Sequence, residues 1–271
     1  MIKAKSISEW IGEKPLRGKY TFTHQDVLDA FPGMAAGTIS KALTREVSKG
    51  KIMSPLRGFY VIIPDEYVLR GAVPQPFYMD DMMRHLGRDY YVALLSAASY
   101  HGASHQVPLS FSVMIEPPTM RDKKEEKYHT LYFCKNHIPN EFVERRQTRT
   151  GYINISCPEL TAVDLLTYQA KNGSITRAAT VLAELTDKTD FSKFDTSFLN
   201  VVPISSMQRL GYILEDVLEE KTAADQIYRL LKSNEVHLQS VPLKSGKSVL
   251  GCERNKKWKI IVNEEIEIDE L

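Results

Sequence analysis

The sequence predicts an α+β protein in which an N-terminal winged helix-turn-helix precedes a larger mixed α/β domain with a small sheet and a helical C-terminal part. Residues 35–50 have apolar side chains at helical spacing on one face and polar or basic side chains on the other. Two β-like runs, 51–54 and 59–63, follow and are joined by a turn containing Pro and Gly. From residue 109 onward, alternating strand patterns appear, and they give way at Pro158 to mainly helical patterns.

Charge is divided unevenly along this chain of 271 residues, although its net charge is only +1. Residues 1–63 carry ten Lys and Arg against five Asp and Glu, which leaves 25 against 29 for the remainder. The first part is therefore +5 and the rest −4. Such an asymmetry favours nucleic-acid binding by the basic part. The length and the hydrophobic content of 43% fit a globular protein of two or three compact units.

Cysteine usage and apolar runs indicate the compartment. Cys134, Cys157 and Cys252 lie far apart without CxxC spacing, which argues against a disulfide framework or a zinc finger. We interpret them as buried thiols in a reducing environment. The first residues lack the apolar core of a signal peptide, and no run of about 18 apolar residues could span a membrane. We therefore expect a cytoplasmic protein.

The first 63 residues divide into three helices and a hairpin. The first helix is expected at 2–11, the second begins at a capping box formed by Thr23 and Asp26, and the third occupies 35–50. The inward-facing residues are expected to be Ile7, Trp10, Ile11, Val27, Leu28, Phe31, Ile39, Leu43 and Val47. Helix, turn and helix followed by a hairpin make a winged helix-turn-helix.

The outward face of the third helix has hydroxyl and cationic side chains and no carboxylate at its centre, so we expect it to enter the major groove of DNA. The expected DNA-binding residues are Arg17, Lys19, Thr38, Lys41, Thr44, Arg45, Ser48, Lys51 and Arg57. Arg45 and Lys41 are candidates for guanine readout, whereas Lys51 and Arg57 approach the backbone or minor groove through the wing. One such domain covers a short half-site, so we expect two copies on inverted-repeat DNA.

Residues 64–78 contain three prolines and a glycine and predict a linker between a DNA-binding domain at 1–63 and a second domain at 79–271, with a sub-boundary near 157. Helices are expected at 79–86, 89–101, 158–169, 174–186, 205–219 and 222–233. Strands are expected at 109–116, 128–134, 141–147, 152–156, 236–243, 248–252 and 257–263, with a loop at 121–127.

Catalytic chemistry has only loose support. His101 and His105 are four residues apart, but a glycine interrupts the helix and no third metal ligand is evident, so a structural role is favoured. Glu116 with Lys123 or Lys127 resembles a nuclease set, yet the spacing is too loose. GxGxxG, GxxxxGK[ST] and GxSxG are absent from the sequence. We predict no catalytic residue, cofactor or metal. A DNA-targeted nuclease or phosphotransfer enzyme and a ligand-sensing winged-helix regulator stay as alternatives.

Several segments together resemble the AbiEi family, the antitoxins of type IV toxin–antitoxin and abortive-infection operons. These segments are RGFYVI at 57–62, YYVALLSAA at 90–98, HGASHQ at 101–106, VDLL at 163–166, QRLGY at 208–212 and WKIIVN at 258–263. The resemblance implies a winged helix that represses its own operon and a larger domain that neutralises a nucleotidyltransferase-like toxin, with phage defence as the setting. It implies no catalytic residues, and it leaves open whether the toxin is bound directly.

Overall fold

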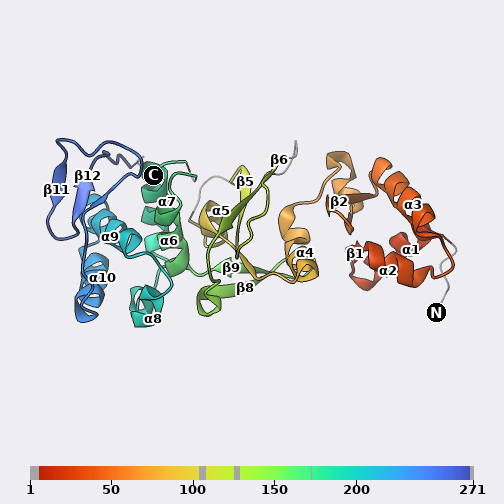
Figure 1. The fold of residues 1–271 in the computed structure, drawn as a ribbon, viewed down its shortest axis with the longest axis horizontal. Coiled ribbons are helices and arrows are strands. Elements are labelled where there is room, and N and C mark those ends of the chain that lie inside the picture. Colours follow the sequence, from red (N-terminus) through yellow and green to blue (C-terminus); the bar gives the residue numbers. More distant parts are fainter. Residues whose placement is uncertain (1–5, 104–107, 125–128, 172, 269–271) are drawn as a thin grey trace.

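The computed structural model describes residues 6–103, 108–124, 129–171 and 173–268. The molecule is elongated, with the N-terminal helices at one end and the C-terminal strands at the other (Figure 1). The first elements are α1 (Ile7–Glu13), β1 (Thr21–Thr23), α2 (His24–Ala30), α3 (Ala36–Ser48), β2 (Ile52–Leu56) and β3 (Phe59–Ile62). The three strands form an antiparallel sheet in the order β1-β3-β2.

A mixed six-stranded sheet occupies the middle of the chain in the order β6-β7-β5-β4-β9-β8. Its strands are β4 (Tyr90–Val92), β5 (Ser110–Ile115), β6 (Lys123–Lys124), β7 (His129–Cys134), β8 (Val143–Gln147) and β9 (Tyr152–Ser156). The 3-10 turns η2 (Asp65–Arg70) and η3 (Gln75–Phe77) and helix α4 (Met79–Leu86) precede the sheet, α5 (Leu94–Tyr100) follows β4, and η4 (Asn140–Phe142) precedes β8.

The C-terminal part is helical and ends in a three-stranded sheet, β10-β12-β11. Its helices are α6 (Pro158–Thr167), α7 (Ile175–Thr186), α8 (Thr196–Leu199), α9 (Ile204–Tyr212) and α10 (Lys221–Ser233), with the 3-10 turn η5 (Phe191–Lys193) before α8 and a π-helical turn η6 (Ile213–Val217) after α9. The strands are β10 (Val241–Pro242), β11 (Glu253–Asn255) and β12 (Ile260–Val262). Together the described elements make a mixed α+β protein with small sheets.

Three hydrophobic cores follow one another along the molecule. The N-terminal core includes Ile7, Ile11, Phe22, Val27, Ile39, Leu43, Ile52 and Ile62. The middle core includes Phe59, Val61, Met79, Met82, Met83, Val92, Val113 and Ile155. The C-terminal core includes Tyr91, Met114, Leu160, Leu182, Leu210, Ile227 and Trp258. Because successive side chains of a strand point to opposite faces, β4 and β5 supply residues to the middle core on one face of the central sheet and to the C-terminal core on the other.

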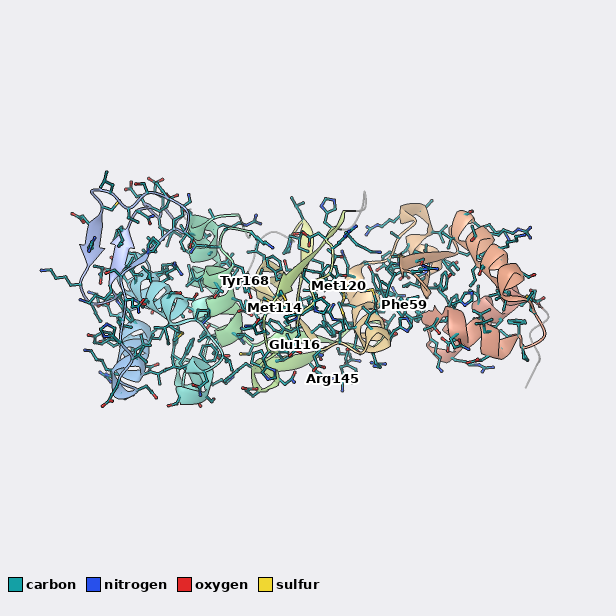
Figure 2. All side chains as sticks on the ribbon, viewed as in Figure 1. Phe59, Met114, Glu116, Met120, Arg145 and Tyr168 are labelled. Atoms are coloured by element: carbon teal, nitrogen blue, oxygen red, sulfur yellow. The ribbon has the colours of Figure 1, made fainter. Side chains whose placement is uncertain are left out.

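Strand β3 belongs to two of these cores. Phe59 and Val61 lie in the middle core, whereas Ile62 lies in the N-terminal core and Tyr60 packs against it. Phe59 stacks on His85 of α4, with the ring centroids 5.6 Å apart, and lies where the N-terminal elements meet α4 (Figure 2). The N-terminal sheet is therefore covered on both faces.

Residues 64–78, expected to link two domains, contribute buried side chains. Val73 is fully buried in the middle core. The Gln75 side-chain amide donates to the His129 carbonyl oxygen and to the Thr130 hydroxyl, each at 3.1 Å. This segment is thus held against the central sheet over part of its length.

Several expected elements differ in the structure. The helix expected at 89–101 begins with β4, since Tyr90–Val92 is a fully buried central strand and lacks the alternation of a half-exposed one. The strand expected at 248–252 is not formed, and the one at 236–243 is reduced to β10. All three cysteines are free thiols, but only Cys157 is buried.

Candidate nucleic-acid interface

Helix α3 presents the outward face that the sequence predicted. The side chains of Ile39 and Leu43 are buried in the N-terminal core. The predicted outward residues Thr38, Lys41, Thr44, Arg45 and Ser48 are all exposed. An apolar stripe on one side and a polar, basic stripe on the other follow directly from the 3.6-residue period.

The last turn of α3 corrects the prediction. Val47, expected inside, is 38% exposed, and Glu46 is buried at 5% exposure. Residues 39, 43 and 46 follow the i, i+4, i+7 spacing of one helix face, whereas 47 has rotated away from it. Glu46 tolerates burial because its carboxylate accepts hydrogen bonds from the Ser8 hydroxyl at 3.2 Å and the Lys49 ammonium at 2.8 Å.

The same carboxylate changes the role of two cations. Burial acts to raise the pKa of Glu46, but the hydrogen bonds from Lys49 and Ser8 and the charges of Lys49 and Lys51 outweigh it and lower the pKa. The Lys51 ammonium lies 3.8 Å from the Glu46 carboxylate. Lys51, expected to approach DNA, is therefore partly neutralised within the protein.

The remaining cations of the predicted interface are available to an anion. Arg17, Lys19, Lys41, Arg45 and Arg57 are exposed. Within the described part of the chain, none of these five forms an ion pair with a carboxylate. Unpaired surface cations are the groups that contact phosphates with salt-sensitive affinity.

The turn between β2 and β3 is tight and is joined to the start of α2. Gly58 adopts φ +80°, which a side chain at this position would disfavour. The Ser54 hydroxyl hydrogen-bonds the Leu56 carbonyl oxygen at 2.9 Å and the Phe59 carbonyl oxygen at 3.1 Å. The Gly58 carbonyl oxygen accepts from the His24 backbone N–H at 2.8 Å. Arg57, in this turn, is thus held close to α2.

His24 connects three elements, a role that sequence reasoning did not anticipate. Thr23 and Asp26 form the predicted capping box, with the Thr23 hydroxyl accepting from the Asp26 N–H at 3.1 Å. His24 follows this cap, and its Nε2 lies 3.3 Å from the Ser40 hydroxyl on α3. The capping box correctly predicted where α2 begins, but nothing in the sequence placed His24 beside α3.

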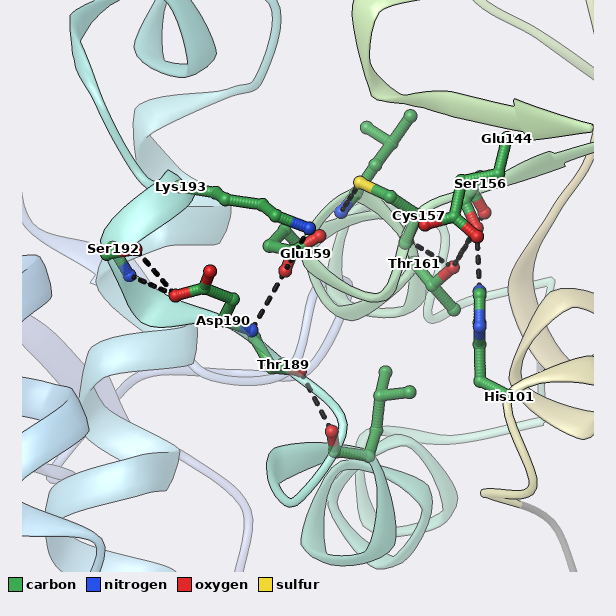
Figure 3. Close-up of polar contacts among 12 residues, drawn as sticks. His101, Glu144, Ser156, Cys157, Glu159, Thr161, Thr189, Asp190, Ser192 and Lys193 are labelled. Carbon is green, nitrogen blue, oxygen red and sulfur yellow. Dashed lines mark hydrogen bonds and ion pairs between the residues drawn. The ribbon is translucent and has the colours of Figure 1, made fainter.

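The His101 region is a structural hydrogen-bond network (Figure 3). Nε2 of His101, at the end of α5, donates to the Ser156 carbonyl oxygen at 2.7 Å, and the Ser156 and Thr161 hydroxyls lie 2.6 Å apart. Burial lowers the pKa of His101 and thereby favours its neutral imidazole. His105 lies outside the described residues. Among the residues described, no group of three or more His, Cys, Asp or Glu side chains is placed to hold a metal ion.

The nuclease-like set is not assembled as an ion pair. The Glu116 carboxylate accepts from the Ile138 backbone N–H at 2.9 Å and lies 3.3 Å from Nδ1 of His137. In the part of the chain that the structure describes, Glu116 and Lys123 do not form a salt bridge, and Lys127 lies outside that part. The Glu116 carboxylate therefore holds the segment after β7, through its contacts with His137 and Ile138.

Two buried polar clusters involve the other segments singled out in the sequence. The Tyr91 hydroxyl donates to Asp164 at 2.6 Å, and the Lys135 ammonium lies 3.2 Å from the same carboxylate. Burial raises the pKa of Asp164, with the Lys135 charge acting against it. The Gln208 amide donates to the Trp258 carbonyl oxygen at 2.7 Å and thereby joins α9 to the segment before β12.

No helix among the described residues is long and apolar enough to cross a membrane. Residues 91–216 match a family model described as the AbiEi antitoxin C-terminal domain. None of the curated proteins compared with the chain matches it. The crystal structure of the RV2827C protein from Mycobacterium tuberculosis is similar in fold, with a TM-score of 0.62, 17% sequence identity, and coverage of 92% of this chain and 88% of that one.

Proposed function

Residues 91–216 place the chain in the AbiEi antitoxin family, so it is an antitoxin of a toxin–antitoxin system, and we propose that it neutralises a nucleotidyltransferase-like toxin and represses its own operon. The family match is the observation that carries the antitoxin assignment. We propose no catalytic step for the protein. We propose that it acts in the cytoplasm.

We propose that residues 1–63 are a winged helix-turn-helix that binds operator DNA, that 64–78 connect it to the antitoxin domain at 79–271, and that α3 is the recognition helix. Support comes from the exposed face of α3 and from the unpaired cations around it. Lys41 and Arg45 supply phosphate affinity and guanine contacts, and Arg57 reaches the backbone from the turn between β2 and β3. Since one such unit covers a short half-site, two copies bind an inverted repeat.

DNA binding is tested by fluorescence anisotropy with the DNA upstream of the operon. We expect Arg45→Ala to weaken binding, because it removes an exposed cation that forms no ion pair with a carboxylate of the described residues. The matched control is Lys221→Ala, an exposed cation at the start of α10 that carries the same charge change far from α3. Equal affinity of the Arg45→Ala variant and the wild type for this DNA would contradict the assignment of α3.

Antitoxin activity is tested by co-expression with the adjacent toxin gene, with growth as the readout. We expect the wild type and the Arg45→Ala variant to rescue growth equally, because the family match lies outside residues 1–63. Loss of rescue in the Arg45→Ala variant, at equal protein levels, would contradict the separation of the two roles.

A further inference from the structure

Two hydroxyl groups on the outward face of α3 donate hydrogen bonds to backbone carbonyl oxygens of the same helix. The Thr44 hydroxyl donates to the Ser40 carbonyl oxygen at 2.9 Å, and the Ser48 hydroxyl donates to the Thr44 carbonyl oxygen at 3.0 Å. Both side chains are exposed. Each bond spans one helical turn, so the two oxygens lie one above the other on the same face.

A hydroxyl has one proton and two acceptor lone pairs. Once the proton is used inside the helix, the group can accept a hydrogen bond from a ligand but cannot donate one without breaking the internal bond. Thr44 and Ser48 therefore present acceptors to anything that approaches α3. The Ser40 hydroxyl differs from these two in its partner, because its oxygen lies 3.3 Å from a side-chain atom, Nε2 of His24.

An acceptor is selective in the major groove. The groove-facing donors of DNA are the N6 amino group of adenine and the N4 amino group of cytosine, whereas guanine offers O6 and N7 and thymine offers O4, all of which are acceptors. Phosphate oxygens are acceptors too. An acceptor-only hydroxyl is matched by an amino-bearing base and by neither a phosphate nor a guanine edge.

We propose that Thr44, with Ser48 one turn further, reads an adenine or cytosine amino group in the operator, while the neighbouring donors Lys41 and Arg45 read guanine. This assignment rests on the proposed DNA-binding function of α3 and adds its base preference. The face then combines acceptors and donors in adjacent rows, which specifies a mixed sequence and not a run of guanines.

Thr38 provides a contrast on the same helix. It is exposed near the start of α3, and among the described residues its side chain makes no hydrogen bond that would occupy its proton. Its hydroxyl can therefore donate to a phosphate. Thr38→Val makes the same substitution on the same helix, but it removes a hydroxyl whose proton is not used inside the helix. It is therefore the matched control for Thr44→Val.

The test is a cycle between the protein hydroxyl and the base amino group. The operator is first mapped by footprinting on the upstream DNA. A duplex that carries it is then prepared with single adenines replaced by purine, which lacks N6, and single cytosines replaced by 2-pyrimidinone, which lacks N4. Affinities are measured by fluorescence anisotropy for the wild type and for the Thr44→Val, Thr44→Ser and Thr38→Val variants. Valine keeps the shape of threonine, and serine keeps its hydroxyl.

At one operator position, we expect loss of the amino group to weaken the wild type by about fivefold, the value of one hydrogen bond of about 1 kcal/mol. Thr44→Val should lose a similar factor on unmodified DNA and lose nothing more when that amino group is absent. Thr44→Ser should behave like the wild type, and Thr38→Val should stay sensitive to the replacement.

Two results would overturn this assignment. One is a Thr44→Val variant that stays as sensitive as the wild type to every amino deletion. The other is a Thr44→Ser variant that loses affinity for unmodified DNA while Thr44→Val keeps it, because the threonine methyl, which valine retains and serine lacks, would then be the reader. A wild type that shows no specific binding to the upstream DNA would instead reject the proposed DNA-binding function itself.

Discussion

Gly211 in α9 lies against the Trp258 ring, and replacing it with alanine should destabilise the protein. A Cβ atom built at this position would be 2.1 Å from Cη2 and Cζ3 of Trp258. The shortest ordinary Cβ contacts are 3.4 Å, so the ring would have to retreat by about 1.3 Å. The methyl group therefore needs space that the C-terminal core does not have.

Trp258 is poorly able to retreat. Its side chain is fully buried, and its Nε1 donates to the Glu215 carboxylate at 2.5 Å. Its backbone carbonyl oxygen is held by Gln208 at 2.7 Å, and its ring makes an edge contact with Tyr228 at a centroid distance of 5.5 Å. Any shift of the indole disturbs these contacts together.

The magnitude follows from two opposing effects. Overpacking of a core costs about 1–3 kcal/mol, whereas Gly→Ala within a helix gains about 0.5–1 kcal/mol. We expect Gly211→Ala to lower the free energy of unfolding by about 1–2 kcal/mol. For a chain of this size, the melting temperature should fall by roughly 3–6 °C.

The assay is thermal unfolding followed by circular dichroism, with Gly37→Ala as the matched control. Gly37 also lies within a helix, in the first turn of α3, but a Cβ there would meet no atom of the described residues within 4 Å. The control should therefore gain up to about 0.5–1 kcal/mol, the value for a glycine in the middle of a helix. If Gly211→Ala raised the melting temperature as Gly37→Ala does, the packing argument for α9 and Trp258 would be wrong.

Three further variants test the cores and the buried charge. Phe59→Ala should cost about 3–5 kcal/mol and speed amide hydrogen exchange in both α3 and α4; a change confined to one of them would show that the cores are independent. Tyr91→Phe removes the donor to Asp164 and should cost about 1.5–3 kcal/mol in urea unfolding; unchanged stability would mean that this carboxylate does not need it. Because the pKa of Glu46 is lowered on folding, this group stabilises the protein above its unfolded pKa of about 4.3 and loses that effect as the pH falls through the folded value. Glu46→Gln should therefore lose less stability between about pH 5 and pH 3 than the wild type, and equal losses in pH-dependent unfolding would contradict the pairing with Lys49.

The α3 face was predictable because local periodicity decides it. Ile39 and Leu43 follow the helical period, and they are buried as expected. Glu46 was not predictable in the same way, since its burial depends on Ser8 and Lys51, which come from other elements. From its charge alone, a glutamate is predicted to be exposed. Its burial can be recognised only once the residues that pair with it are known.

Strand β4 shows a different limit. Tyr90, Tyr91 and Val92 are buried on both faces of the sheet, so they lack the period-2 pattern that identifies a half-exposed strand. Adjacent alanines favoured a helix, and only the pairing with β5 and β9 decides otherwise. The Tyr91 contact with Asp164 joins residues far apart in the chain and is fixed by this pairing.

Strand β3 contributes side chains to both the N-terminal and the middle core, and this limits where segments can be exchanged between related proteins. Four consecutive residues, 59–62, face two sets of neighbours in turn, so a substitution suited to one side must also suit a backbone fixed by the other. A transplant cut at residue 64 would set the native β3 against a foreign α4 and separate Phe59 from His85. A functional chimaera of two relatives should therefore carry the three N-terminal strands and α4 from the same parent.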